Sequence, residues 1–144
     1  INARHTRRNG RDDHELGAAL ALPLDERWAF NASATASPSH RVLARQGGTL
    51  GLARSLDGGW VLGASLGRSL FGGNGSSTTG SSILRLSGER YVGAWRFALG
   101  LARSRLDGGQ TENGWVAQID HYVGERGRLG FVVARGRELE NVPE

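Results

Sequence analysis

The chain alternates between short and long connectors, and this rhythm constrains its fold more than any other feature. The short connectors are Asp25-Glu26-Arg27, Asp57-Gly58-Gly59, Tyr91-Val92-Gly93 and Gly124 to Gly127, and the long polar ones are Ser37 to Gly48, Phe71 to Ser81 and Arg105 to Asn113. A strand meander with one tight end and one loop-rich end is typical of outer-membrane β-barrels, which have short periplasmic turns and longer outer loops. The connectors therefore predict an all-β, antiparallel, up-and-down transmembrane β-barrel.

The segments between the connectors alternate apolar and polar residues, which is the period of a strand. In Trp28 to Ser37, aromatic and alanine residues occupy every second position, and Asn31, Ser33 and Thr35 lie between them. The Asp-Gly step at residue 57 is a strong hairpin signal. We expect about eight strands, at His14 to Leu24, Trp28 to Ser37, Thr49 to Ala53, Trp60 to Gly67, Leu84 to Glu89, Trp95 to Leu101, Trp115 to Tyr122 and Leu129 to Gly136.

A chain of 144 residues is long enough for one domain. Residues 1–13 match no motif and are interpreted as a polar N-terminal segment or outer loop, and residues 14–144 as the β-barrel domain, either complete or incomplete at both ends. If the short connectors are periplasmic, the first strand starts outside and the last one ends outside. Bacterial barrels usually have an even number of strands, so we expect at least one further strand on each side, in a barrel of 10–12 strands. A closed eight-stranded barrel is the competing interpretation.

Composition excludes several classes of protein. The longest run of small and apolar residues, Gly17 to Leu24, is far shorter than the roughly 20 residues that a membrane-spanning helix needs. Cysteine is absent, which removes disulfides and thiolate metal sites. The net charge is +4, but the basic residues, all of them arginine, are scattered singly, so nucleic-acid binding is not expected.

The tryptophans indicate which face meets lipid. Trp28, Trp60 and Trp95 each begin a strand after a short connector, so all three are expected at one end, whereas Trp115 follows a long connector and belongs to the other. Aromatic residues at both ends of the strands resemble the interfacial girdles of membrane barrels. The apolar face is therefore predicted to face lipid. The alternative is a soluble ligand-binding barrel in which the same face is the apolar interior.

The opposite face is then a polar lumen. Opposite charges on neighbouring strands would pair there, either as a network that stiffens the wall or as a selective constriction for a small polar solute or glycan. The candidate lumen-lining residues are Asn31, Ser33, Thr35, Arg85, Glu89, Tyr91, Arg96, Gln118, Asp120 and Tyr122.

No catalytic, metal or cofactor site is predicted. Asp120 and His121 are the one acid–base pair, but neighbours on a strand point to opposite faces. Asp12-Asp13-His14 is interpreted as a loop of mixed charge, and the other two histidines, His5 and His40, lie in unrelated settings. The glycine-rich stretch Gly72 to Gly75 precedes no helix and so is not a phosphate-binding loop. We therefore expect a protein that is not an enzyme.

Two short motifs resemble the YaiO family of outer-membrane β-barrels. They are Glu89-Arg90-Tyr91-Val92-Gly93-Ala94-Trp95-Arg96, which matches a Glu-x-Tyr-x-Gly segment before an arginine-bearing strand, and Gly136-Arg137-Glu138-Leu139-Glu140, which matches a Gly-x-Glu-x-Glu segment closing a late strand. The resemblance spans most of residues 37–142. It implies a barrel of about twelve strands in the outer membrane of a Gram-negative bacterium, with no defined activity.

Together these observations predict a non-enzymatic outer-membrane barrel that contacts lipid and acts as a pore or as a structural or envelope-assembly component, with a link to surface polysaccharide as one option. A surface adhesin that uses the loop Phe71 to Ser81 is a further hypothesis. Protein partners, oligomeric state and solute are not encoded in a readable form.

Overall fold

The computed structural model describes residues 2–8, 11–38, 44–72, 78–124 and 127–136. Within these residues the secondary structure consists of nine β-strands and no helix, so nothing helical in them is long and apolar enough to cross a membrane. The strands are β1 (Asn2–Arg8), β2 (Arg11–Pro23), β3 (Trp28–Ala36), β4 (Gln46–Leu56), β5 (Trp60–Gly72), β6 (Thr78–Val92), β7 (Trp95–Leu106), β8 (Thr111–Val123) and β9 (Gly127–Arg135).

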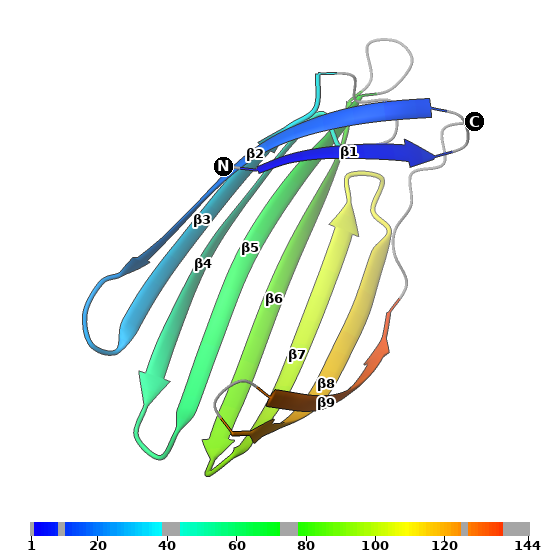
Figure 1. The fold of residues 1–144 in the computed structure, drawn as a ribbon. Helices are drawn as coiled ribbons and strands as arrows, with labels where there is room; N and C mark the ends of the chain where they lie inside the picture. Colours follow the sequence, from blue (N-terminus) through cyan, green and yellow to red (C-terminus); the bar gives the residue numbers. More distant parts are fainter. Residues whose placement is uncertain (1, 9–10, 39–43, 73–77, 125–126, 137–144) are drawn as a thin grey trace.

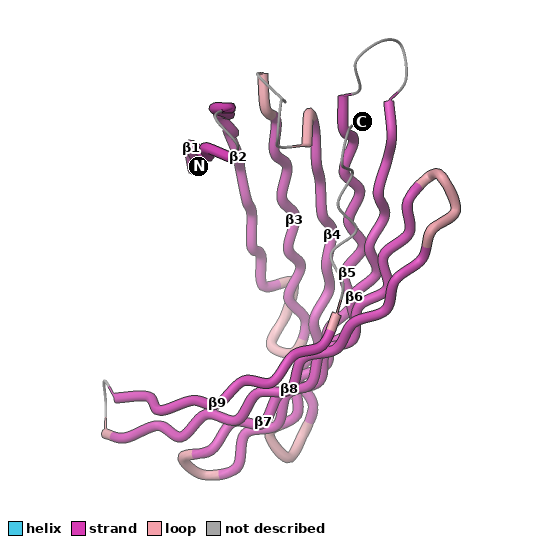
Figure 2. The backbone as a smooth tube through the Cα atoms, turned by 90° about the vertical axis from the view of Figure 1, so that its right-hand side faces the viewer, coloured by secondary structure: helices cyan, strands magenta, loops and turns pink. Residues whose placement is uncertain are grey.

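All nine strands form one sheet in which each strand pairs with its neighbours in the sequence (Figure 1). Every pair is antiparallel, which confirms the predicted all-β, up-and-down meander. The sheet is strongly curved, because β7–β9 bend away from β2–β5 (Figure 2). In the described residues β1 and β9 are edges that do not pair with each other, so the sheet is open.

The connectors fall at two ends of the sheet, as predicted. We call the end at which β2 is joined to β3, β4 to β5 and β6 to β7 the lower end, and the opposite one the upper end (Figure 1). The two loops predicted at Phe71 to Ser81 and Arg105 to Asn113 were too long, since β5–β8 extend into both. Backbone pairing continues there through polar residues that carry no alternation signal. The loop core, residues 73–77, with most of the stretch Gly72 to Gly75, lies outside the described residues.

The N-terminal segment also differs from the prediction. Within residues 1–13, for which we expected no strand, β1 pairs with the start of β2 from Asn2↔Gly17 to Arg8↔Arg11. The hairpin lies across the upper end of the sheet (Figure 1). Its residues are almost all polar, so backbone hydrogen bonds rather than a buried apolar face form it, and periodicity could not reveal it. It supplies a ninth strand on the N-terminal side of the eight predicted.

A tight turn at the lower end joins β4 to β5. Gly58 and Gly59 have φ angles of 78° and 76°, a region that residues with a Cβ rarely adopt. Gly59 also lies against the neighbouring strand, where the Tyr91 amide donates a hydrogen bond to the Gly59 carbonyl at 2.8 Å. Glycine is therefore required at 59 both for the turn and for the close approach of β6.

The two faces of the sheet differ in composition and in exposure. Cross-strand partners share a face, and the row Leu50↔Leu66↔Leu84 is one of several that place leucines side by side on the apolar face. These side chains are uncovered: Leu50 and Leu66 are 60% and 61% exposed. Among the described residues, the one buried hydrophobic side chain is that of Leu106. The sheet is thus a single layer without a packed core, and its polar side chains are the more shielded set.

Candidate functional site

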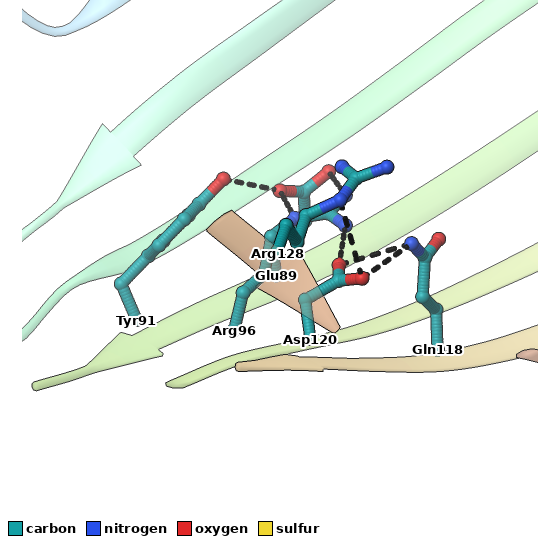
Figure 3. Close-up of polar contacts among 6 residues, drawn as sticks. All are labelled: Glu89, Tyr91, Arg96, Gln118, Asp120 and Arg128. Carbon is teal, nitrogen blue, oxygen red and sulfur yellow. Dashed lines mark hydrogen bonds and ion pairs between the residues drawn. The ribbon is translucent and has the colours of Figure 1, made fainter. Parts of the chain in front are cut away.

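A cluster of charged side chains lies on the polar face near the lower end, centred on Arg96 of β7 (Figure 3). Arg96 donates two parallel hydrogen bonds to Glu89, from Nε to Oε2 at 2.8 Å and from Nη2 to Oε1 at 2.9 Å. Its Nη1 donates to Oδ2 of Asp120 at 2.7 Å, and the hydroxyl of Tyr91 donates to Oε2 of Glu89 at 2.9 Å. A guanidinium held by a bidentate carboxylate pair has a fixed orientation.

Asp120 is the most shielded member of the cluster, with 1% of its surface exposed. Besides Arg96, it accepts hydrogen bonds from the Gln118 amide nitrogen at 3.0 Å and 2.9 Å. Arg128 of β9 adds an ion pair, with Nε 3.8 Å from Oδ1 of Asp120. Burial of an unpaired carboxylate is costly, and these three partners offset that cost.

The strand register explains why these residues meet. The turn at 93–94 places Tyr91 opposite Arg96, and the β7–β8 pairing places Arg96 opposite Asp120. Glu89 and Gln118 are two positions from Tyr91 and Asp120 on their own strands, so they share the same face. Three neighbouring strands therefore bring residues 89 to 120 into one cluster.

The ten predicted lumen residues all lie on this polar face, but they do not form one site. Asn31, Ser33 and Thr35 of β3 lie opposite Gly51, Thr49 and Gly47 of β4, well away from the cluster. Tyr122 lies opposite Arg128 and makes no side-chain hydrogen bond to the described residues.

Arg85 is separate from the cluster. It lies higher on β6, between Ser65 and Ala102, and has no ion-pair partner among the described residues. In contrast to Arg96, it leaves an uncompensated positive charge on the polar face.

Two residues of the site were not predicted from the sequence, Arg128 and Gly130. Gly130 lies opposite Asp120, and a Cβ there would collide with Oδ1 of the Asp120 carboxylate. Both residues lie on the polar face of β9, which also carries Val132 and Ala134. Alternation along β9 could have placed Arg128 on this face. It could not have given the β8–β9 register that brings Arg128 to Asp120.

The four tryptophans predicted as girdle residues all lie on the apolar face. Trp28 and Trp60, at the lower end, are each covered by an arginine from a neighbouring strand: Arg54 lies 5.0 Å from the Trp28 ring and Arg90 lies 5.2 Å from the Trp60 ring. Such cation–π contacts hold a charged group beside an apolar surface. The third lower tryptophan is Trp95, and the fourth, Trp115, lies nearer the upper end, opposite Leu101.

The acid–base pair Asp120 and His121 is divided between the two faces of the sheet. Asp120 lies on the polar face, whereas His121 lies on the apolar face with its ring 4.4 Å from that of Trp95. No three His, Asp or Glu side chains of the described residues gather in a group that could hold a metal ion. The segment Asp12-Asp13-His14, which was interpreted as a loop, is instead part of β2. His14 lies opposite His5 of β1, so these two histidines do not lie in unrelated settings. His40 lies outside the described residues.

The charged cluster is internally satisfied. In the described part of the chain, no buried side-chain nitrogen or oxygen lacks a hydrogen-bond partner. The two carboxylates of Glu89 and Asp120 balance the two guanidinium groups of Arg96 and Arg128. The cluster is therefore neutral and fully bonded, and it links β6, β7, β8 and β9.

Comparison with known proteins adds no further information, because no family model, curated protein or solved structure gives a significant match to the chain. The YaiO-like resemblance therefore depends on its two motifs alone. The second of them extends into residues 137–140, which lie outside the described residues.

Proposed function

We propose that the chain forms part of the wall of an outer-membrane β-barrel in a Gram-negative bacterium. The exposed face of the curved sheet contacts lipid and the polar face lines an aqueous lumen. The protein is not an enzyme, and it serves as a pore or as a structural or envelope-assembly component. This is also the kind of protein that the YaiO-like motifs imply.

One observation carries the proposal: the large apolar side chains lie on the uncovered face of a single-layer sheet. Leu16, Leu66, Leu129 and Phe131 are each more than half exposed, and a hydrophobic surface of this extent is unfavourable in water. Lipid chains would cover it without a second protein layer. Strands of 9–15 residues from β2 to β9 are long enough for a tilted crossing of the hydrocarbon core.

The ends of the apolar band support the same interpretation. At the lower end, Arg54 and Arg90 are stacked on tryptophans, and at the upper end Arg103 and Arg105 follow Leu101 and end the apolar row of β7. Arginines and tryptophans on both sides of an apolar band are typical of the two membrane interfaces. The connector lengths favour the lower end as the periplasmic one.

Barrel closure requires more strands than the nine described. Because neighbours alternate in direction, β1 and β9 run the same way, so they could pair directly only in parallel. An odd number of additional strands would complete an antiparallel wall, in line with the expected 10–12. Cysteines in β1 and β9 would then be joined by a long bifunctional reagent but not by a disulfide, which needs Cα atoms less than about 7 Å apart. A disulfide would contradict this part of the proposal.

The soluble-barrel alternative needs the apolar face to be enclosed. The described residues show no second layer over that face, and its leucines are exposed. The favoured assignment is therefore lipid outside and water inside.

Single cysteines in β3 test the proposal, since the natural chain has none. The replacements Ala32→Cys, Ser33→Cys and Ala34→Cys change little volume and probe the two faces in turn. After refolding into liposomes, an environment-sensitive label should report lipid at 32 and 34 and water at 33. Ser33→Cys is the matched control, because it lies on the same strand between the other two.

Two results would contradict the proposal. One is a label signal without period two across residues 32–34. The other is a chain that stays in solution without detergent and shields positions 32 and 34 from water.

A further inference from the structure

A patch of arginines lies on the apolar face directly above its leucines, near the upper end. In one cross-strand row Arg68 lies opposite Ser82, which lies opposite Arg105. In the row below, Leu66 lies opposite Leu84, which lies opposite Arg103. The three arginines thus belong to strands β5 and β7 on either side of β6. We call Arg68, Arg103 and Arg105 the upper arginine patch.

Arg68 is held in place before any ligand arrives. Its Nη1 donates to the Ser82 hydroxyl at 2.8 Å, and its Nη2 donates to Oδ2 of Asp107 at 2.9 Å. The same Asp107 oxygen accepts a hydrogen bond from the Gly80 amide at 2.9 Å. The guanidinium is therefore fixed over β6 with further N–H groups to spare.

Arg103 and Arg105 are exposed and have no ion-pair or hydrogen-bond partner among the described residues. On β8, the residues opposite them are polar and uncharged: Asn113 lies opposite Arg103 and Thr111 lies opposite Arg105. With Asp107 counted against Arg68, the patch keeps two uncompensated positive charges. Amide and hydroxyl groups beside them can donate further hydrogen bonds to an oxyanion.

We propose that the upper arginine patch binds the phosphate of a phosphorylated lipid in the outer leaflet, with its acyl chains lying along the leucines below. This inference rests on the proposed membrane location. Phosphate fits the donors, since guanidinium groups bind its oxygens in a bidentate manner. The lipid tails fit the surface underneath, where Leu66, Leu84 and Leu101 are 61%, 44% and 50% exposed.

Charge and apolar area together favour a lipid over a free anion. A free phosphate would interact with the arginines alone. A lipid would in addition bury the exposed leucine surface in the neighbouring cross-strand row. Among the described residues, the apolar face has no equivalent patch at the lower end. There Arg54 and Arg90 are each stacked on a tryptophan, Trp28 and Trp60 respectively. The asymmetry assigns the site to the upper leaflet.

The test compares two double variants with the same loss of charge on the same face. R103Q/R105Q removes the free arginines of the patch, and R54Q/R90Q removes the two lower arginines as the matched control. Each protein is refolded into vesicles of digalactosyldiacylglycerol, whose headgroup carries no phosphate, that contain a minor fraction of phosphatidic acid or, as the control, of diacylglycerol. Native mass spectrometry after extraction into detergent then measures retained phosphatidic acid.

Retention of phosphatidic acid should fall about thirtyfold in R103Q/R105Q, as expected for two interfacial charges. It should stay near the wild-type level in R54Q/R90Q, and diacylglycerol should not be retained by any of the proteins. If R103Q/R105Q does not refold, R105Q alone should show about a fivefold loss.

Three results would overturn the site. Equal loss in both double variants would show general attraction to an anionic surface. Displacement of the lipid by an equal concentration of inorganic phosphate would show a free-anion site. Unchanged retention in R103Q/R105Q would show that the patch does not bind the lipid. A wild-type chain that never inserts into vesicles would overturn the proposed function as well. A flotation assay distinguishes this outcome, because such a chain does not float with the vesicles.

Discussion

The carboxylate of Asp120 on β8 occupies the space that a side chain at Gly130 on β9 would need. A Cβ built at Gly130 collides with Oδ1 of Asp120, which is 1% exposed. The absence of a side chain on β9 thus lets Asp120 lie against the sheet, where Arg96, Gln118 and Arg128 reach it. The arrangement of the charged cluster therefore requires a residue without a Cβ at position 130.

Gly130→Ala should therefore destabilise the folded protein by about 1–3 kcal/mol, since the added methyl group must displace a fully bonded carboxylate. The free energy of unfolding in urea, measured in detergent micelles, checks this. Gly88→Ala is the matched control, because a Cβ at Gly88 meets only Leu62, at an ordinary 3.6 Å. Equal effects of the two substitutions would argue against the collision.

Asp120→Asn tests the charge of the same group without changing its shape. The variant keeps an oxygen acceptor but leaves the positive charge of Arg96 and Arg128 balanced by Glu89 alone. We expect a loss of about 1–3 kcal/mol of stability, read from the urea midpoint. Glu112→Gln is the control, because Glu112 lies on the same face and has no partner in the described residues, so its loss should barely change the urea midpoint. An unchanged urea midpoint in Asp120→Asn would show that the cluster adds no stability.

Arg85 and Arg96 should differ in their effect on ion flow. Arg96 is neutralised by two carboxylates, whereas Arg85 is an uncompensated cation on the polar face. If that face lines a pore, Arg85→Gln should lower the anion-to-cation permeability ratio several-fold, because a charge in the lumen sets selectivity. Reversal potentials under a salt gradient in planar bilayers give the ratio. Arg103→Gln removes the same charge from the opposite face, and an equal shift there would refute a role for the lumen.

Arg96→Gln should act mainly on folding. Its loss leaves Glu89 and Asp120 without their shared donor, so the fraction of refolded protein should drop while the reversal potential of what does fold changes little. A shift in selectivity with unchanged folding would instead identify Arg96 as part of a constriction.

The connector between β2 and β3 should give the protein an acid-sensitive contribution to stability. The backbone N–H groups of Arg27 and Trp28 both donate to the Asp25 carboxylate at 2.7 Å, which lowers the pKa of Asp25 from its ordinary value. A lowered pKa means that the folded state binds this proton less readily than the unfolded state. The contribution is therefore complete above about pH 4 and is lost as the pH falls through the lowered pKa.

Urea midpoints of the wild type and of Asp25→Asn, measured from about pH 6 downward, test this. The difference between them should shrink below about pH 4. Glu26→Gln is the control, because Glu26 lies in the same connector and has no partner in the described residues. The difference in urea midpoint between this variant and the wild type gives the effect of removing an unpaired acid. A gap between wild type and Asp25→Asn that stays constant with pH would contradict the assignment.

Alternation along single strands was enough to predict an all-β antiparallel sheet. Trp28 to Ala36 and Trp95 to Leu101 have a strict period of two, and each lies within a strand with the predicted faces. All ten predicted lumen residues share one face because side-chain direction in a strand is a local property of the backbone. Connector order likewise gave the up-and-down topology, since short turns force antiparallel neighbours.

Apolar–polar alternation failed to predict strands whose pairing depends on backbone hydrogen bonds alone. The almost entirely polar β1 was interpreted as a polar N-terminal segment or outer loop, because an edge strand held by backbone hydrogen bonds needs no apolar period. The upper ends of β5–β8 were cut short for the same reason.

The sequence by itself determined which residues share a face and in which order the strands follow, because both depend on neighbours along the chain. Only the tertiary structure decided which residues of one face meet. Asp120 finds Arg128 and Gly130 through the β8–β9 register, and Arg68, Ser82 and Arg105 align through two registers in succession. Register is set by cooperative pairing over whole strands, and a shift of two residues would keep every face while changing every contact.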